Sequence, residues 1–208
     1  VGSEMCIRDS ILFLRFKYPR KLLALFSSRI FNKKPNNLIA VTGTNGKSSV
    51  ANFYFQIASL NKVKAASIGT LGINGLNIKK NFSNTTFDPI EINNILQKLK
   101  QKKIENVILE ASSHGLNQNR LYGLKFDIGI FTNLSRDHLD YHKTFQNYFN
   151  SKLILFRQLM KKNSCAIYDN DLKIASNLNR IIKSNNIKKF TIGSANSSFK
   201  ILEHQFLK

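Results

Sequence analysis

A glycine-rich segment between a predicted strand and a predicted helix is the feature that most constrains this chain. The segment Val-Thr-Gly-Thr-Asn-Gly-Lys-Ser occupies residues 41–48, after an apolar run at 38–40 and before a helix-forming stretch at 50–57. A strand, a glycine turn and a helix in this order point consecutive backbone N–H groups at one spot, where the helix dipole adds positive potential. Lys47 can reach a terminal phosphate and the Ser48 hydroxyl can bind Mg²⁺. The sequence therefore predicts a nucleoside triphosphate site.

The glycine loop is tighter than the general phosphate-binding loop, which has four residues between its glycines. Here only Thr44 and Asn45 separate Gly43 from Gly46, and Val41 stands where the general pattern has its first glycine. Gly-Lys-Ser alone would be weak evidence for a phosphate site, because an ordinary turn before a helix can have the same residues. The complete string of residues 42–48 is far more specific.

The net charge of +20 is unusual for a chain of 208 residues. The rest of the composition, with 42% hydrophobic and 21% charged residues, is ordinary for a globular protein. One interpretation is a nucleic acid or anionic membrane partner. The other is a lysine-rich compositional bias with an anionic ligand, and it is favoured because the lysines are scattered and no nucleic-acid-binding motif accompanies them. Two cysteines are too few for a disulfide framework, so we expect a cytoplasmic protein.

The most apolar stretch, residues 11–31, is broken by basic residues and is too interrupted for a membrane span or a signal peptide. Its spacing predicts an amphipathic helix with Leu22, Leu23, Phe26 and Ile30 on one face. We expect residues 1–37 to be a truncated N-terminal remnant or linker. Within it, residues 1–10 start no recognisable element and read as a truncated or misjoined terminus.

Strands and helices alternate along the rest of the chain. Strands are expected at 38–40, 64–68, 107–109, 126–131, 165–168 and 190–192, and helices at 50–57, 89–103, 144–161 and 171–184. Asp88 is a good N-cap for the second of these helices, and Asn74-Gly75 is typical of a type I′ hairpin. The alternation predicts an α/β fold with a mainly parallel, doubly wound sheet of P-loop type.

Polar residues follow several of the predicted strands directly. The glycine loop, Glu110 and Asn133 all stand at predicted carboxyl ends, where ligands collect in such sheets. An acid facing a phosphate loop is a usual Mg²⁺ ligand, although a lone acid at a strand end is more often solvated.

Two polar loops complete the candidate site. Residues 111–120 carry hydroxyls, amides and a guanidinium, which suit a carboxylate or pyrophosphate, although a polar surface loop is the alternative. His138 and His142 have the i, i+4 spacing of a metal pair if that segment is helical. Zinc would need more ligands than the sequence supplies, so one histidine contributing to a Mg²⁺ or Mn²⁺ site is the better interpretation.

Three segments together closely resemble the central domain of the Mur ligase family. They are Thr-Gly-Thr-Asn-Gly-Lys-Ser at 42–48, Glu-Ala-Ser-Ser-His-Gly-Leu at 110–116 and Thr-Asn-Leu-Ser-Arg-Asp-His-Leu-Asp-Tyr-His at 132–142. The third string favours the MurE type, the UDP-N-acetylmuramoyl-tripeptide synthetases, over the sister ligases and folylpolyglutamate synthetase. The matches span roughly residues 38–168. Phe87 replaces a usual proline and Ser48-Ser49 a commoner threonine pair.

The resemblance implies roles for individual residues. The ATP phosphates would be bound by Thr42, Gly43, Thr44, Asn45, Gly46, Lys47 and Ser48, with Asn133 also at the nucleotide. Mg²⁺ would be held by Ser48, Glu110, His138 and a carbamylated Lys152, so Lys47, Glu110, His138 and Lys152 form the catalytic set. The acceptor UDP-MurNAc-L-Ala-D-Glu would be contacted by Asn84, Thr85, Thr86, Ser112, Gln118 and Arg120.

The implied reaction is ATP-dependent amide formation in peptidoglycan precursor synthesis, in which a diamino acid, meso-diaminopimelate or lysine, joins the acceptor through an acyl phosphate. Residues 38–208 would be the central ATP-binding domain, incomplete at its C-terminus, and inactive alone. We expect a monomer. The alternatives are a sister or folylpolyglutamate synthetase-like ligase, and a basic nucleotide-binding module that engages nucleic acid.

Overall fold

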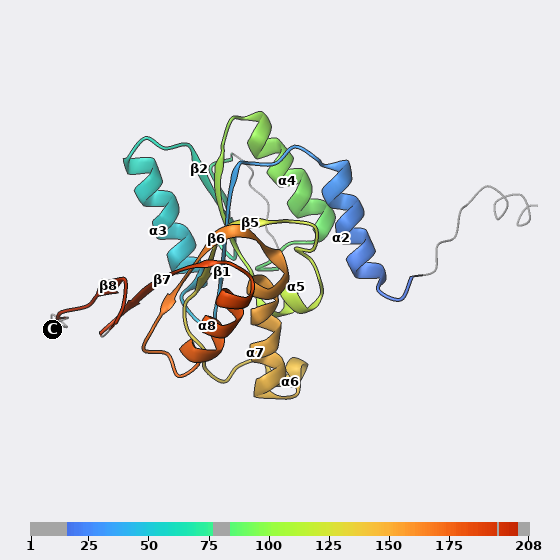
Figure 1. Cartoon of the computed structure of the whole chain (residues 1–208). Helices are drawn as coiled ribbons and strands as arrows, with labels where there is room; N and C mark the ends of the chain where they lie inside the picture. The colour runs from blue at the N-terminus through green and yellow to red at the C-terminus, as the bar shows by residue number, and fades with distance from the viewer. Residues whose placement is uncertain (1–15, 77–83, 195, 204–208) are drawn as a thin grey trace, which may run out of the picture.

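A single eight-stranded sheet organises the molecule in the computed structural model, which describes residues 16–76, 84–194 and 196–203. The strand order is β3-β2-β4-β1-β5-β6-β7-β8, and Figure 1 shows the sheet at the centre of the molecule, between helices. All neighbours are parallel except β2 and β3, which form an antiparallel edge. The strands are β1 Asn37–Thr42, β2 Ala65–Gly69, β3 Gly72–Asn74, β4 Asn106–Glu110, β5 Phe126–Phe131, β6 Met160–Asp169, β7 Lys188–Gly193 and β8 Phe199–Lys200.

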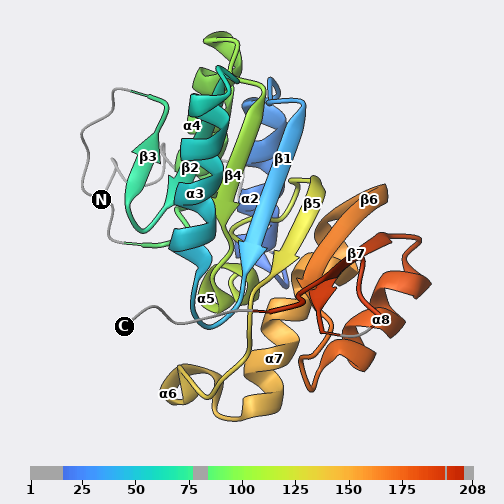
Figure 2. The same cartoon turned by 90° about the vertical axis from the view of Figure 1, so that its left-hand side faces the viewer.

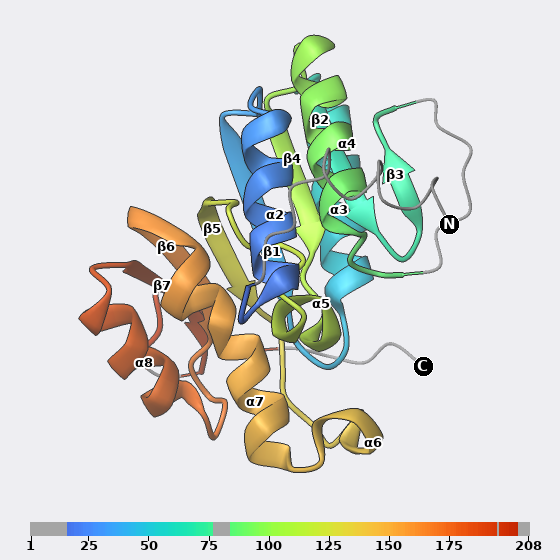
Figure 3. The same cartoon turned by 90° about the vertical axis from the view of Figure 1, so that its right-hand side faces the viewer.

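Helices lie on both faces of the sheet, as in a doubly wound fold. They are α2 Pro19–Ile30, α3 Lys47–Leu60, α4 Pro89–Gln101, α5 Ser113–Asn117, α6 Leu139–His142, α7 Phe145–Ile154, the π-helical turn η1 Leu155–Leu159, and α8 Ala175–Ser184. Figure 2 shows α3 on one face of the sheet, and Figure 3 shows α2 and α4 on the opposite face. The predicted α/β class with a mainly parallel sheet is confirmed.

The alternation of side chains along β1 explains the two layers. Leu38 and Ala40 join the large core that α4, α7, η1 and α8 cover. Ile39 and Val41 point to the other face and join a small cluster with Ala51 of α3. The small cluster leaves Ile128 and Ile130 of β5 only partly buried.

Several predicted elements form where their sequence signals place them. Asp88 caps α4 by accepting a hydrogen bond from the Ile90 backbone N–H at 2.9 Å, and Ile92, Ile95, Leu96 and Leu99 are all buried. Thr144 caps α7 through the Asn147 N–H at 3.1 Å. Among the described residues, no helix is long and apolar enough to cross a bilayer.

The structure contains a hairpin turn at Thr70 and Leu71 that was not predicted, because Gly69 pairs with Gly72. The hairpin expected at Asn74-Gly75 stays a prediction, since the strand expected after Gly75 lies largely outside the described residues. Two helix limits differ from the expected ones. The helix expected to reach residue 161 stops at Leu159, where β6 begins. The next helix starts at Ala175 rather than at 171, because residues 170–174 form turns.

The predicted apolar face of α2 was also wrong. Leu23, Phe26 and Ile30 are exposed, whereas Ala24 and Ser27 are buried. The helix lies close to α4, and its small residues Ala24 and Ser28 lie against Gly123 of the loop that follows α5. The expected odd terminus at residues 1–10 lies outside the described residues.

Candidate functional site

The glycine loop connects β1 directly to α3. Gly46 is the N-cap of α3 and has a φ of +82°, a left-handed conformation that favours glycine. At Gly43, an added Cβ would lie 1.9 Å from the Thr132 Oγ1, so a side chain there would displace the end of β5. Both glycines of the motif are therefore required by the loop itself.

Lys47 folds back over the loop that carries it. Its ammonium donates hydrogen bonds to the carbonyl oxygens of Gly43, at 3.0 Å, and Thr44, at 2.7 Å. Burial lowers the pKa of Lys47, and the negative charge of Glu110 opposes that shift. The cation thus lies at the mouth of the loop, where phosphate oxygens would be bound.

The segment after β5 holds the glycine loop in shape. The Asn133 backbone carbonyl accepts from the Thr44 N–H at 3.0 Å, and its side-chain oxygen accepts from the Asn45 N–H at 2.9 Å. Thr132 Oγ1 donates to the Asn45 carbonyl at 2.6 Å. Asn133 therefore lies against the loop, and its side-chain oxygen supports the loop backbone. Its role at the nucleotide stays a prediction.

Glu110 is buried at the end of β4 and collects hydrogen bonds from two elements. Ser48 Oγ donates to one carboxylate oxygen at 2.9 Å. The Thr70 backbone N–H donates to the other at 2.9 Å. A Cβ on Gly69 would lie 2.1 Å from the Glu110 carboxylate, so a glycine is needed in the neighbouring strand. The hydroxyl and the carboxylate thus form a pair of oxygen donors of the kind that Mg²⁺ prefers.

Lys152 is the most deeply buried charged side chain of the site, at 1% exposure. Its Nζ donates to the Gly43 carbonyl at 2.7 Å and lies 4.3 Å from the centre of the Tyr148 ring. Burial, reinforced by the positive charge of Lys47, lowers the pKa of Lys152 to about 7. The lysine predicted from the family resemblance thus lies against the phosphate loop.

Three histidine rings gather beside Lys152. The His114 ring lies 4.8 Å from that of His138 and 5.4 Å from that of His142. His138 precedes α6 in a left-handed conformation, so the two histidines of the predicted pair are not on one helix. His142 is instead buried against Tyr148, at a ring distance of 5.3 Å.

Within the described residues, no group of three or more His, Cys, Asp or Glu side chains is arranged to hold a metal. A Mg²⁺ ion at Ser48 and Glu110 would therefore complete its coordination with phosphate oxygens and water, as this ion usually does. No role was predicted for His114 from the sequence. Its position in the polar loop after Glu110 was the signal that could have indicated one.

Four of the six residues predicted for the acceptor, Thr86, Ser112, Gln118 and Arg120, are joined by hydrogen bonds. Thr86 is buried, donates to the Glu110 carbonyl at 2.8 Å and accepts from the Ser112 N–H at 2.9 Å. Arg120 Nη1 donates to the Thr86 carbonyl at 2.6 Å, and its Nε and Nη2 donate to the Gln118 side-chain oxygen at 3.0 and 2.8 Å. Thr86 is therefore occupied in holding Ser112 and Arg120, which both line the neighbouring cavity.

A cavity of about 320 Å³ joins the two halves of the site. It is lined by Lys47, Asn84, Thr85, Ser112, Ser113, His114, Arg120, His138, Tyr148 and Lys152. Three cationic side chains and several hydroxyls around one hollow suit a ligand that carries negative charge. The fold and site define a P-loop nucleotide-binding domain with an adjoining pocket lined by cationic and hydroxyl side chains.

Comparison with known proteins gives the family. Residues 41–208 match the family model described as the Mur ligase middle domain. The chain therefore belongs to the Mur ligase family.

Two curated relatives carry the name UDP-N-acetylmuramoyl-L-alanyl-D-glutamate–2,6-diaminopimelate ligase. The chain is 41% identical to the one from Brucella melitensis over 167 residues, which cover 80% of the chain and 34% of the relative. It is 43% identical to the one from Rickettsia montanensis over 202 residues, which cover 92% of the chain and 42% of the relative. A solved structure of a ligase with the same name superposes with a TM-score of 0.75 at 30% identity, covering 88% of this chain and 38% of the other. The chain thus spans well under half the length of these relatives.

Proposed function

We propose that this chain provides the ATP-binding and acceptor-binding half of a ligase that joins 2,6-diaminopimelate to UDP-MurNAc-L-Ala-D-Glu. The observation that carries the proposal is the cavity in which Lys47 and Lys152, from the phosphate-loop side, face Ser112 and Arg120. The names of the relatives favour diaminopimelate over lysine as the amine. We propose a cytoplasmic reaction, because ATP would be its substrate.

The reaction would proceed in two steps. A carboxylate oxygen of the acceptor attacks the terminal phosphorus of ATP, ADP leaves, and an acyl phosphate forms. The amine then attacks the acyl carbon, phosphate leaves with the bonding electrons, and the amine loses a proton. Lys47 would offset negative charge on the transferring phosphoryl group.

Ser48 and Glu110 are the residues that would hold Mg²⁺, which supplies further neutralisation of phosphate charge. The hydrogen bond of 2.9 Å between their oxygens supports this assignment. His138, which lines the same cavity, would also contribute to a Mg²⁺ site. Gln118 would act by orienting the Arg120 guanidinium, given the two hydrogen bonds between them.

Lys152 would act as a carbamate. A pKa of about 7 leaves a large neutral fraction near neutral pH. The lone pair of the neutral Nζ would form an N–C bond with CO₂ and an N–H proton would leave, which converts a buried cation into a carboxylate-like anion. That anion would stand beside the phosphate loop, where a second Mg²⁺ would be bound.

The experiment that tests the nucleotide site is the substitution Lys47→Ala, measured by ATP titration with Mg²⁺ present. We expect the Kd for ATP to rise at least about tenfold, because a charge-assisted contact contributes about 1.5–3 kcal/mol. Thermal melting should change little, since the Lys47 side chain lies over a loop and its loss leaves no core cavity.

Lys64→Ala is the matched control, because Lys64 is exposed and lies at the opposite end of β2 from the site. It should bind ATP like the unmodified chain. Unchanged ATP affinity in Lys47→Ala would contradict the phosphate-loop assignment and, with it, the proposed function.

A further inference from the structure

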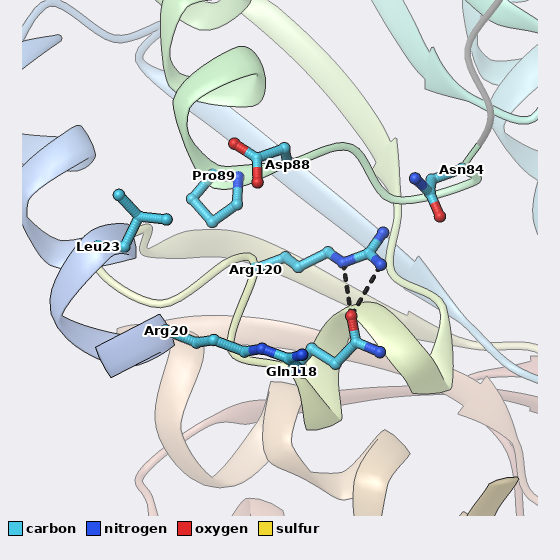
Figure 4. Close-up of a pocket in the computed structure, with 7 residues that line it drawn as sticks. All are labelled: Arg20, Leu23, Asn84, Asp88, Pro89, Gln118 and Arg120. Carbon is cyan, nitrogen blue, oxygen red and sulfur yellow. Dashed lines mark hydrogen bonds between the residues drawn. The ribbon is translucent and has the colours of Figure 1, made fainter. Parts of the chain in front are cut away.

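A second cavity, of about 290 Å³, adjoins the first and faces two arginines from distant parts of the chain (Figure 4). It is lined by Arg20, Leu23, Asn84, Asp88, Pro89, Gln118 and Arg120. Asn84 and Arg120 line both cavities, whereas Lys47 and Lys152 line only the first. The second cavity therefore extends the site away from the phosphate loop and toward α2.

Arg120 is held rigidly at the border of the two cavities. Its Nε and Nη2 both donate to the Gln118 side-chain oxygen, as Figure 4 shows, and Nη1 donates to the Thr86 carbonyl. A guanidinium has five N–H groups. These three bonds therefore leave two N–H groups for a ligand.

Arg20 is presented by a helix that is fixed to the loop following Arg120. Lys21, the next residue of α2, places its ammonium 4.4 Å from the centre of the Tyr122 ring. Farther along α2, Ser28 contacts Gly123 so closely that an added Cβ would lie 2.5 Å from the Ser28 Oγ. The backbone that carries Arg20 is thus held in a constant relation to Arg120.

The charges around this cavity are unbalanced. Arg20 has no hydrogen bond or ion pair to another residue that the structure describes. Burial lowers the pKa of Arg120, and the positive charge of Arg20 lowers it further, while Asp88 raises it. The Asp88 carboxylate also accepts the capping hydrogen bond of α4. An anion between the guanidiniums would relieve their repulsion.

We propose that Arg20 and Arg120 together bind an oxyanion of the acceptor substrate that takes no part in the chemistry. This inference rests on the proposed function and adds Arg20 to the acceptor-binding residues. UDP-MurNAc-L-Ala-D-Glu carries two such groups, namely the glutamate carboxylate that is not phosphorylated and the pyrophosphate. A guanidinium fork matches the oxygens of either group in a bidentate manner.

The test compares Arg20→Gln with Arg29→Gln in the 208-residue chain, by calorimetric titration of UDP-MurNAc-L-Ala-D-Glu at low salt. Arg29 is the matched control because it is an exposed arginine of the same helix and lines neither cavity. We expect the Kd for the acceptor to rise at least tenfold in Arg20→Gln and less than twofold in Arg29→Gln. Arg20→Lys should fall between them, because one ammonium cannot form a bidentate contact. The Kd for ATP should stay the same in all three.

Two further ligands identify the oxyanion. One is an acceptor whose non-reacting carboxylate is an amide, and the other is the MurNAc dipeptide without UDP. One of these two ligands should bind to Arg20→Gln and to the unmodified chain with equal affinity. That ligand is the one that lacks the oxyanion recognised by Arg20.

Equal affinity of Arg20→Gln and the unmodified chain for the complete acceptor would overturn this proposal and leave the proposed function standing. A parallel loss of ATP affinity in Arg20→Gln would also overturn it, because the effect would then be general. Failure of the unmodified chain to bind the acceptor would contradict the proposed function itself.

Discussion

At the scale of single residues, Lys152 shows how strongly position changes chemistry. It is one of 32 basic residues in the chain, yet it is 1% exposed and lies among Gly43, Tyr148 and Lys47. No acid forms an ion pair with it among the described residues, and the negative charge of Asp137 only partly opposes the lowering of its pKa. A buried amine of this kind is destabilising while it is charged.

The sign of the pH effect follows from the direction of this pKa shift. The unfolded lysine keeps a pKa of 10.5, whereas the folded one has a pKa of about 7. Between these values the unfolded state binds more protons, so the contribution of Lys152 to the free energy of unfolding rises with pH, by at most about 1.4 kcal/mol per unit.

We therefore expect the free energy of unfolding of the unmodified chain to rise between pH 7.5 and 9.5. In Lys152→Met this rise should be smaller, because the titrating amine is absent. Methionine fills a similar volume without a charge, so the variant should be the more stable of the two near pH 7. Urea unfolding of both proteins across this range of about two units measures the difference. Parallel pH profiles would show that Lys152 keeps its ordinary pKa in the folded chain.

At the scale of elements, α4 joins local sequence signals to the site. Asp88 caps the helix, Pro89 occupies its first turn, and Leu96 and Leu99 are fully buried beneath it. The same Asp88 and Pro89 line the second cavity. Correct initiation of α4 therefore also shapes the second cavity, which we propose to be part of the acceptor site.

We expect Asp88→Ala to lower the free energy of unfolding by about 1 kcal/mol, because the Ile90 N–H loses its acceptor. Asp88→Asn should retain most of the stability, since asparagine is an equally good N-cap. Urea denaturation of both variants measures the two effects. Equal destabilisation by alanine and asparagine would mean that the charge of Asp88, rather than its capping bond, stabilises the helix.

At the scale of the whole molecule, the described residues assemble the part of the site that we propose to bind ATP and the acceptor. They provide the phosphate loop, the Ser48–Glu110 pair and the two adjoining cavities. The chain spans 34–42% of the length of the two curated relatives compared above. Ligation depends on holding both substrates in a reactive geometry and on excluding water.

We therefore expect the 208-residue chain alone to bind ATP but not to catalyse ligation at a useful rate. The measurement is phosphate release with UDP-MurNAc-L-Ala-D-Glu, ATP, Mg²⁺ and either diaminopimelate or lysine. A full-length ligase of the same family serves as the positive control. Turnover near that of the control would show that these residues contain a complete active site.

The sequence by itself determined the local features of this protein. Strand, turn and helix signals placed β1, the glycine loop and α3, and Asp88-Pro89 placed the start of α4, because these depend on backbone preferences over a few residues. The positions of Glu110 and Asn133 at strand ends also followed from apolar runs alone. Their convergence on the loop then followed from the rule that parallel strands end at one edge.

Only the tertiary structure decided which side chains are buried and what they face. The exposed apolar residues of α2 show this, because the buried face of the helix carries Ala24 and Ser27 instead of the large apolar side chains. Lys152 reads like any other lysine until α7 brings it to the Gly43 carbonyl, and Arg20 gains a role only when α2 lies beside the loop that follows Arg120. Such pairings join residues about 100 positions apart, and long-range packing, which no local pattern encodes, determines them.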